Sequence, residues 1–224
     1  MRRDIPRTAF RRPETPLQRT VTEDGLCYAI DFGAGYSVGL FLDQRANRQF
    51  VRRAAPSRLL NCFAYTCSFS IVAGTAGADT LSVDLSKKSL NRGRDNFMLN
   101  RLATDRHRFL ADDVLQVLPR LARKGERFDM VILDPPTFSR SRTGKAWQVE
   151  HDFERLLLTA LEVAERDAKI LLSTNCTKLN GRALEVMGRY CLKATRRAAS
   201  FQFPPRLPDF PPGTGASSVW MILR

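Results

Sequence analysis

The chain has 224 residues, with 36 lysines and arginines against 23 aspartates and glutamates, which gives a formal net charge of +13. Hydrophobic residues make up 43%, enough for a sizeable core, but no stretch approaches the roughly 20 uncharged apolar residues that span a bilayer. We therefore expect no transmembrane helix, and the arginine-rich start without an apolar signal core gives no indication of export. The excess positive charge favours a polyanionic partner such as nucleic acid.

The chain opens with a segment that we predict to be a flexible basic arm, residues 1–25, because residues 1–20 contain six arginines and three prolines. Residues 26–55 are predicted to form a small β-hairpin and helix element. Within it, residues 26–42 show short β-rich runs broken by a Gly-Ala-Gly turn, which indicates a hairpin, and a helix is expected to follow as far as about Ala54.

From residue 56 to 224 the pattern changes to strands that alternate with helices, which predicts an α/β fold with a mostly parallel, doubly wound sheet of seven strands. The expected strands cover 59–63, 79–84, 107–111, 128–134, 168–174, 196–203 and 217–223, and the expected helices cover 67–76, 86–100, 113–124 and 147–166. Ligands of such folds bind at the carboxyl ends of the strands.

Four of these strand ends carry residues suited to a nucleotide-like ligand. Small residues within 61–69 allow a close backbone approach, Asp84 can accept both hydroxyls of a ribose, and an acid at Asp112-Asp113 can accept from an adenine amino group. The prolines of Asp134-Pro135-Pro136 stiffen a turn and direct a carbonyl into the cleft. Each acid could instead simply cap a helix, and the missing G-x-G-x-x-G turn argues against a dehydrogenase.

Several segments together resemble the bacterial large-subunit ribosomal RNA methyltransferases that act on cytosine C5 or guanine N7. The matching stretches are LFLDQRANR, LLNCFAYT, VDLSKKSLNRGRDNFMLN, FDMVILDPPTFSRS and NCT. The resemblance covers about residues 28–180 and implies a Rossmann-like class I methyltransferase domain behind a small β-rich element, with S-adenosylmethionine as cofactor and ribosomal RNA as partner.

Carried over to this sequence, the resemblance implies that one set of residues contacts the cofactor: Phe63, Tyr65, Thr66, Asp84, Asp113 and Asp134. Asp134 and Pro135 also match the catalytic loop. Two departures stand out. Relatives usually carry Gly-Gly where this chain has Cys67-Ser68, which adds a side chain where the backbone should approach the cofactor. No segment of the sequence matches the PUA RNA-binding domain of the family, so we expect a methyltransferase domain without it.

The target atom stays open between two chemistries. Methylation of cytosine C5 needs a thiolate that adds to C6, and Cys176 after the fifth strand is the candidate, although it could equally be a small buried residue. Methylation of a purine nitrogen needs no nucleophile; Asp134, Pro135 and Pro136 would then position the base and Phe138 would stack on it. Arg140 and Arg142 could hold phosphate beside the target.

Two functions compete with an RNA methyltransferase: a methyltransferase-like RNA-binding protein without catalysis, and a methyltransferase with a substrate other than RNA. The five cysteines lack the paired short spacings of a disulfide framework or zinc site, and there are only two histidines. We therefore expect a cytoplasmic protein without a metal.

Overall fold

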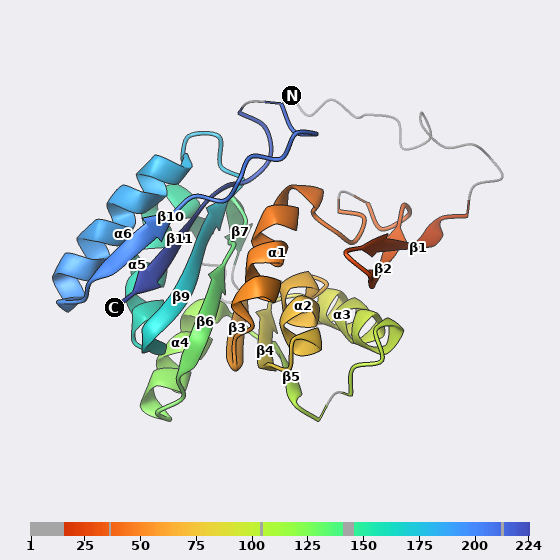
Figure 1. Ribbon diagram of the computed structural model, residues 1–224, viewed down its shortest axis with the longest axis horizontal. Coiled ribbons are helices and arrows are strands. Elements are labelled where there is room, and N and C mark those ends of the chain that lie inside the picture. The colour runs from red at the N-terminus through yellow and green to blue at the C-terminus, as the bar shows by residue number, and fades with distance from the viewer. Residues whose placement is uncertain (1–15, 36, 104, 141–145, 212) are drawn as a thin grey trace.

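A computed structural model describes residues 16–35, 37–103, 105–140, 146–211 and 213–224, with the backbone alone at 139, 140 and 146. Its centre is a seven-stranded sheet in the order β10-β11-β9-β6-β3-β4-β5 (Figure 1). The strand β11 runs opposite to the other six, which are parallel to one another. The strands are β3 (Arg58–Cys62), β4 (Asp79–Asp84), β5 (His107–Ala111), β6 (Phe128–Leu133), β9 (Ala164–Thr174), β10 (Ala199–Gln202) and β11 (Ser217–Leu223). The predicted α/β fold with a mostly parallel sheet of seven strands is confirmed.

Helices cover both faces of the sheet. One face carries α1 (Arg45–Ala54), α2 (Ser68–Thr75) and α3 (Lys87–Leu99), and the other carries α4 (Val114–Arg123), α5 (Val149–Leu161) and α6 (Gly181–Thr195). Because successive strand residues point to opposite faces, Leu59 packs with the first group and Leu60 with the second. Strands buried on both faces explain the nearly continuous apolar runs in the sequence.

Side-chain caps fix where three of these helices begin, at the carboxyl edge of the sheet. The Ser86 hydroxyl accepts from the Ser89 backbone N–H at 3.1 Å, and the Asp113 carboxylate accepts from the backbone N–H of Leu115 at 2.9 Å. The Asn180 side chain caps α6 by accepting from the backbone N–H of Ala183. The caps satisfy N–H groups that the first turn of a helix leaves unpaired.

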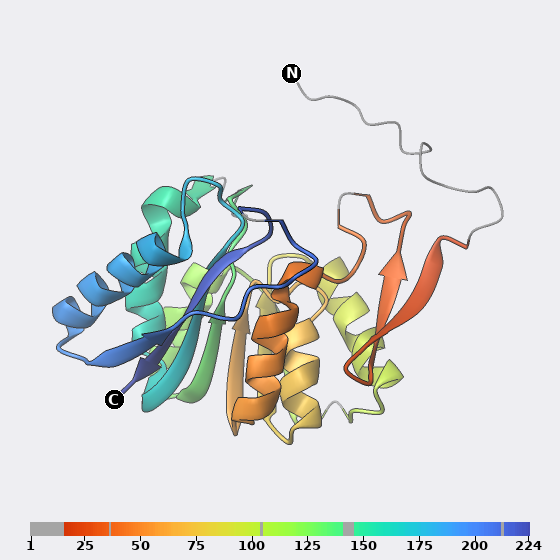
Figure 2. The same ribbon diagram turned by 45° about the horizontal axis from the view of Figure 1, so that its top comes forward.

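The N-terminal hairpin is formed by β1 (Gln18–Glu23) and β2 (Leu26–Asp31), so the predicted position over residues 26–42 is wrong. The turn is Asp24-Gly25, where both residues have positive φ, as a two-residue hairpin turn requires. Residues 16–25, expected in the basic arm, therefore belong to the hairpin, while residues 1–15 lie outside the described part of the chain. Figure 2 shows the hairpin beside α3, and β2 contacts that helix.

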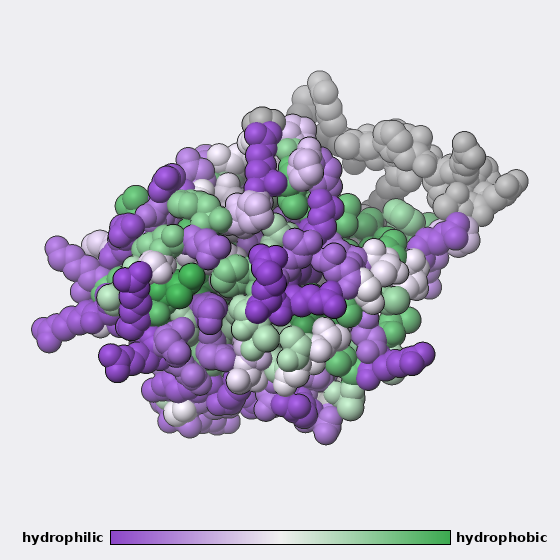
Figure 3. Space-filling model, in the orientation of Figure 1, coloured by the Kyte–Doolittle hydropathy of each residue, from purple (hydrophilic) through white to green (hydrophobic). Residues whose placement is uncertain are grey.

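Other elements differ from expectation around the fourth and fifth strands. A short antiparallel pair, β7 (Phe138–Arg140) and β8 (Ala146–Gln148), precedes α5, and β9 begins inside the segment predicted as the end of that helix. A short 3-10 helix, η1 (Leu42–Gln44), leads into α1. Hydrophilic residues dominate the face shown in Figure 3, and none of the described helices has the length and apolar character to cross a membrane.

Candidate active site

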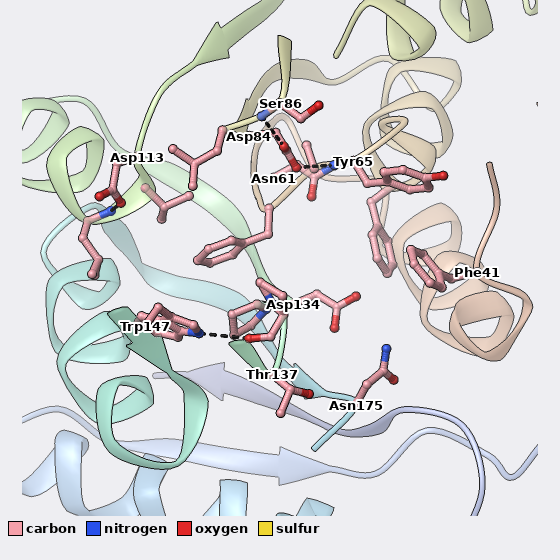
Figure 4. Close-up of a pocket in the computed structure, with 18 of the residues that line it drawn as sticks. Phe41, Asn61, Tyr65, Asp84, Ser86, Asp113, Asp134, Thr137, Trp147 and Asn175 are labelled. Carbon is pink, nitrogen blue, oxygen red and sulfur yellow. Dashed lines mark hydrogen bonds between the residues drawn. The ribbon is translucent and has the colours of Figure 1, made fainter. Parts of the chain in front are cut away.

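A cavity of about 980 Å³ opens at the carboxyl edge of the sheet (Figure 4). Its walls come from the segment before α1 and from the loops after β3, β4, β5, β6 and β9. Most of the site residues expected from the sequence lie along it: Phe63, Tyr65, Thr66, Asp84, Asp113, Asp134, Pro135, Pro136 and Phe138. The roles expected for them stay predictions, but the fold brings them to one place.

The loop between β3 and α2 has an unusual backbone. Phe63, Tyr65 and Cys67 have φ values of 59°, 48° and 64°, in the left-handed region that residues other than glycine seldom adopt. This backbone conformation places Phe63, Tyr65 and Thr66 on the cavity wall and points the Cys67 side chain into the protein, where it is fully buried. Its sulfur occupies the space beside Gly93 of α3, since a Cβ added there would lie 2.5 Å from Sγ. The Cys67 side chain therefore does not enter the cavity.

Asp84, at the end of β4, is held by two backbone donors (Figure 4). Its Oδ2 accepts from the N–H of Tyr65 and its Oδ1 from the N–H of Ser86, both at 2.8 Å. Burial raises the pKa of this carboxyl, and the two N–H groups act in the opposite direction. Each carboxylate oxygen keeps a further acceptor site, so Asp84 can accept two more hydrogen bonds from a ligand in the cavity.

Asp113 and Asp112 have different surroundings. Asp113 lines the cavity together with Val114 and Leu115, while its carboxylate caps α4. Asp112 forms an ion pair with Arg120 and does not line the cavity. The structure therefore separates the two acids that the sequence presents as a pair, and only Asp113 is placed to contact a ligand there.

Asp134, at the end of β6, lies in a densely packed part of the wall. Its Oδ2 accepts from Gln44 Nε2 at 3.0 Å, and Ser173 also hydrogen-bonds the carboxylate. Although the side chain keeps some exposure toward the cavity, burial raises its pKa to about 6. Asp134 is therefore an acceptor that changes charge close to neutral pH.

The rest of the loop after β6 contributes an aromatic wall. The Pro136 carbonyl accepts from Trp147 Nε1 at 2.9 Å, which fixes the loop against β8. Trp147 also lines the cavity, and its ring centroid lies 6.0 Å from that of Phe63. Phe138 is 66% exposed at the rim, where a planar ring could stack on it.

Residues 37–41 close one side of the cavity. Sequence reasoning did not assign this segment a role. Tyr65 Oη donates to the Ser37 carbonyl and Thr66 Oγ1 donates to the Gly39 carbonyl, both at 2.6 Å. The rings of Phe41 and Tyr65 lie 5.3 Å apart. Two residues expected to contact the cofactor thus also hold this segment in place. Sequence reasoning also missed Gln44, Asn61 and Asn175 among the lining residues.

Of the remaining residues expected at the site, one lies away from the cavity and two have no described side chain. Cys176 is 5% exposed and belongs to the hydrophobic core, with Sγ 3.7 Å from Glu150 Oε1, whereas its neighbour Asn175 lines the cavity. Arg140 is described only as backbone of β7, and Arg142 lies outside the described residues. The structure therefore brings the acids and aromatic residues together but not the thiol.

Comparison with known proteins gives a consistent match. The sequence model of a family described as S-adenosylmethionine-dependent methyltransferase matches residues 11–222. Ribosomal RNA large subunit methyltransferase I of Aeromonas salmonicida is 33% identical over 213 residues, 93% of this chain and 53% of that protein. Ribosomal RNA large subunit methyltransferase K of Neisseria meningitidis is 36% identical over 158 residues, 69% of this chain and 45% of that protein. The chain spans about half the length of these relatives.

Solved structures share the fold. SMU.776, described as a methyltransferase and solved in complex with SAH, has a TM-score of 0.83 and 27% sequence identity, covering 94% of this chain and 57% of that chain. A methyltransferase from Agrobacterium tumefaciens has a TM-score of 0.79 at 24% identity, covering 94% of this chain and 72% of that one. The second likeness, at this identity, concerns the fold alone.

Proposed function

The chain belongs to the S-adenosylmethionine-dependent methyltransferase family, and we propose that it transfers the methyl group of this cofactor to a base of ribosomal RNA. The observation that carries the proposal is the shared cavity, where the carboxylates of Asp84 and Asp134 stand at the ends of two strands. Both relatives named above are ribosomal RNA methyltransferases by name. The net charge of +13 suits a polyanionic substrate.

The cavity fits S-adenosylmethionine in volume and in polarity. Its 980 Å³ falls within the range of about 300–1,000 Å³ typical of small-molecule sites. Asp84 would accept from the two ribose hydroxyls, and Asp113 with the apolar surface of Pro119 would hold the adenine. Tyr65 and Thr66 would flank the methionine portion. The cofactor supplies, when bound, a methyl group made electrophilic by its attachment to a positively charged sulfur.

The target base would lie between Asp134 and Phe138. The Asp134 carboxylate would accept an N–H of the base, which orients the nitrogen that takes the methyl group, and the exposed Phe138 ring would stack on the base. A base inside a duplex cannot reach a recessed cavity, so the substrate nucleotide must be unpaired or flipped out.

A purine nitrogen is favoured over cytosine C5 as the target atom. Methylation at C5 needs a thiol that reaches the base in the cavity. Cys176 instead packs with the core and its thiol donates to the partly exposed Glu150, while Asn175 lines the cavity. A nitrogen lone pair attacks the methyl group without a covalent intermediate. The carboxylate of Asp134 and the amide of Asn175 then suffice to orient the base.

The test is transfer of labelled methyl from S-adenosylmethionine to deproteinised ribosomal RNA, followed by mass spectrometry of the nucleosides. Asp84→Ala should weaken cofactor binding by about 1.5–3 kcal/mol, roughly 10- to 150-fold in Kd, and abolish labelling at low cofactor concentration. Asp79→Ala is the matched control, because Asp79 stands at the other end of β4 and pairs with Arg106 on the surface. Equal Kd values for Asp84→Ala and Asp79→Ala would refute the ribose assignment.

The same assay separates the competing functions. We expect a methylated purine, with Cys176→Ala retaining activity; 5-methylcytidine together with an inactive Cys176→Ala variant would establish the C5 route instead. Cofactor and RNA binding without any labelling would indicate an RNA-binding protein that has lost catalysis. Labelling of another class of molecule in a cell extract, but not of RNA, would indicate a different substrate.

A further inference from the structure

A buried chain of hydrogen bonds runs from β11 to the carboxylate of Asp134. Trp220 Nε1 donates to Asn47 Oδ1 at 3.0 Å, and Asn47 Nδ2 donates to Gln44 Oε1 at 2.7 Å. Gln44 Nε2 donates in turn to Asp134 Oδ2 at 3.0 Å. The side chains of Trp220, Asn47 and Gln44 are at most 2% exposed, so water does not compete for these groups.

The indole N–H of Trp220 determines which atom donates and which accepts in each of the other hydrogen bonds of this chain. An indole nitrogen can only donate, whereas a side-chain amide has an accepting oxygen and a donating NH₂ group. Asn47 must therefore present its oxygen to Trp220 and its NH₂ group to Gln44. Gln44 must then present its oxygen to Asn47, which leaves its NH₂ group for the carboxylate of Asp134.

Ser173 on β9 extends this arrangement. Gln44 Nε2 also donates to Ser173 Oγ at 2.8 Å, and because the hydroxyl accepts there, its own hydrogen is free to serve the Asp134 carboxylate that it contacts. Both side-chain donors to Asp134 are thus organised by one glutamine. The glutamine lies in η1 and the acid at the end of β6, 90 residues apart in the sequence.

We propose that Gln44 is a positioning residue for methyl transfer, which fixes the orientation of the Asp134 carboxylate and supplies donors to its charged form. The carboxylate then keeps its remaining acceptor sites for an N–H of the base in the cavity that Gln44 and Asp134 both line. This role rests on the proposed function, since it matters for catalysis only where Asp134 receives the base.

Charges near Asp134 act alongside these donors. Burial raises the pKa of Asp134 most strongly, the Asp43 carboxylate raises it further, and the Arg48 guanidinium lowers it. Arg48 is itself held by the two carboxylate oxygens of Glu23 at 2.6 and 2.7 Å. Because these partners do not involve Gln44, a substitution there removes the amide donor while the nearby charges stay in place.

The first experiment follows the titration of Asp134 by carbon NMR of the carboxyl in the protein alone, with the signal assigned by its loss in Asp134→Asn. Gln44→Leu keeps the approximate volume and removes the donor, so the midpoint should rise by about one pH unit. Gln49→Leu is the matched control, since Gln49 lies in α1, the helix that directly follows Gln44, and donates to Asp24 at 3.1 Å, away from the cavity. It should leave the midpoint unchanged.

Trp220→Phe gives a second variant should Gln44→Leu fail to fold. It keeps an aromatic ring against Phe50, whose centroid lies 4.1 Å from that of Trp220, but removes the one-way donor. The Asn47 side-chain amide can then flip, and the titration midpoint of Asp134 should rise by a smaller amount than in Gln44→Leu. Titration midpoints equal to the wild type in both variants would overturn the proposal, as would a Trp220→Phe midpoint at the wild-type value if only this variant folds.

The second experiment tests the catalytic consequence by methyl transfer to RNA as a function of pH. Gln44→Leu should lower kcat at neutral pH with little change in cofactor affinity, and higher pH should restore the rate because it ionises Asp134. A rate loss that pH does not restore, or an unchanged kcat beside a shifted titration, would overturn the positioning role. The NMR titration needs no substrate, so an enzyme inactive on RNA would count against the proposed function without affecting this measurement.

Discussion

Gly93→Ala and Cys67→Gly together test whether the side chain of Cys67 replaces a Cβ on the neighbouring helix. A Cβ added to Gly93 would lie 2.5 Å from Cys67 Sγ, at least about 1 Å inside the roughly 3.5–4.0 Å optimum for non-bonded heavy atoms. Such overpacking costs about 1–3 kcal/mol, while alanine gains about 0.5–1 kcal/mol over glycine inside a helix. We expect Gly93→Ala to be destabilising by about 1–2 kcal/mol.

The second substitution should reverse the effect of the first. Cys67→Gly removes the sulfur and suits the positive φ of 64°, where a residue other than glycine costs about 1 kcal/mol, although it also leaves a small void. In that background the two closest atoms are gone and the alanine at position 93 keeps an ordinary contact with the Thr66 backbone carbon at 3.5 Å, so it should be neutral or stabilising. The coupling free energy of the two substitutions should therefore reach about 2 kcal/mol.

The measurement is urea unfolding of the wild type, both single variants and the double variant, with S-adenosylmethionine affinity measured by calorimetry alongside. We expect Cys67→Gly to bind the cofactor as the wild type does, because the thiol does not line the cavity. Effects that add within about 0.5 kcal/mol would show that Cys67 and Gly93 do not compete for the same space. A large change in cofactor affinity for Cys67→Gly would place the thiol at the cavity.

Three further outcomes follow from the same structure. The pKa of Asp134 is raised from 3.8 to about 6, so its protonated form stabilises the fold at low pH and this contribution is lost as pH rises through 6. In urea unfolding, the free energy of unfolding of Asp134→Asn should therefore rise relative to that of the wild type by about 2 kcal/mol between pH 4 and 7. RNA affinity, measured by filter binding, should fall steeply with salt, and deletion of residues 1–15 should flatten that slope unless the arm makes no phosphate contacts. Arg48→Leu, which leaves the Glu23 carboxylate without its buried partner, should cost about 3–5 kcal/mol in urea unfolding, whereas loss of the exposed Arg106–Asp79 pair should cost under about 1 kcal/mol.

The parallel strands and their terminal acids could be predicted because local sequence determines them. Apart from Asp129, the residues of FDMVIL are apolar on both faces, and Asp134 follows the strand directly, as expected for a buried parallel strand with an acid at its carboxyl end. The sequence does not fix the position of the hairpin, because Gly33-Ala34-Gly35 and Asp24-Gly25 both suit a turn and only the second pair lies between two strands that bond to each other. The strand β9 begins with the polar residues AERDA, which fit a helix end equally well.

The buried amides beside the cavity could not be predicted from the sequence, for a different reason. Gln44 and Asn47 are spaced as neighbours on one helical face, but nothing in their local sequence shows that this face packs against Ser173 and Trp220. Burial of amides depends on partners that are distant along the chain, and a polar helix face is usually solvated. The location of Cys176 was equally open, because a residue after a strand can turn toward the cavity or into the core.

The strand β11 lies between β10 and β9 and carries Trp220, which bonds to Asn47 from a position 173 residues later in the sequence. Trp220 follows every acid that lines the cavity in the sequence, so the buried amides acquire the donor that orients them only when β11 pairs with β9. Contacts of such sequence separation form late and slowly, so the orientation of Asp134 would be among the last features acquired as the chain folds.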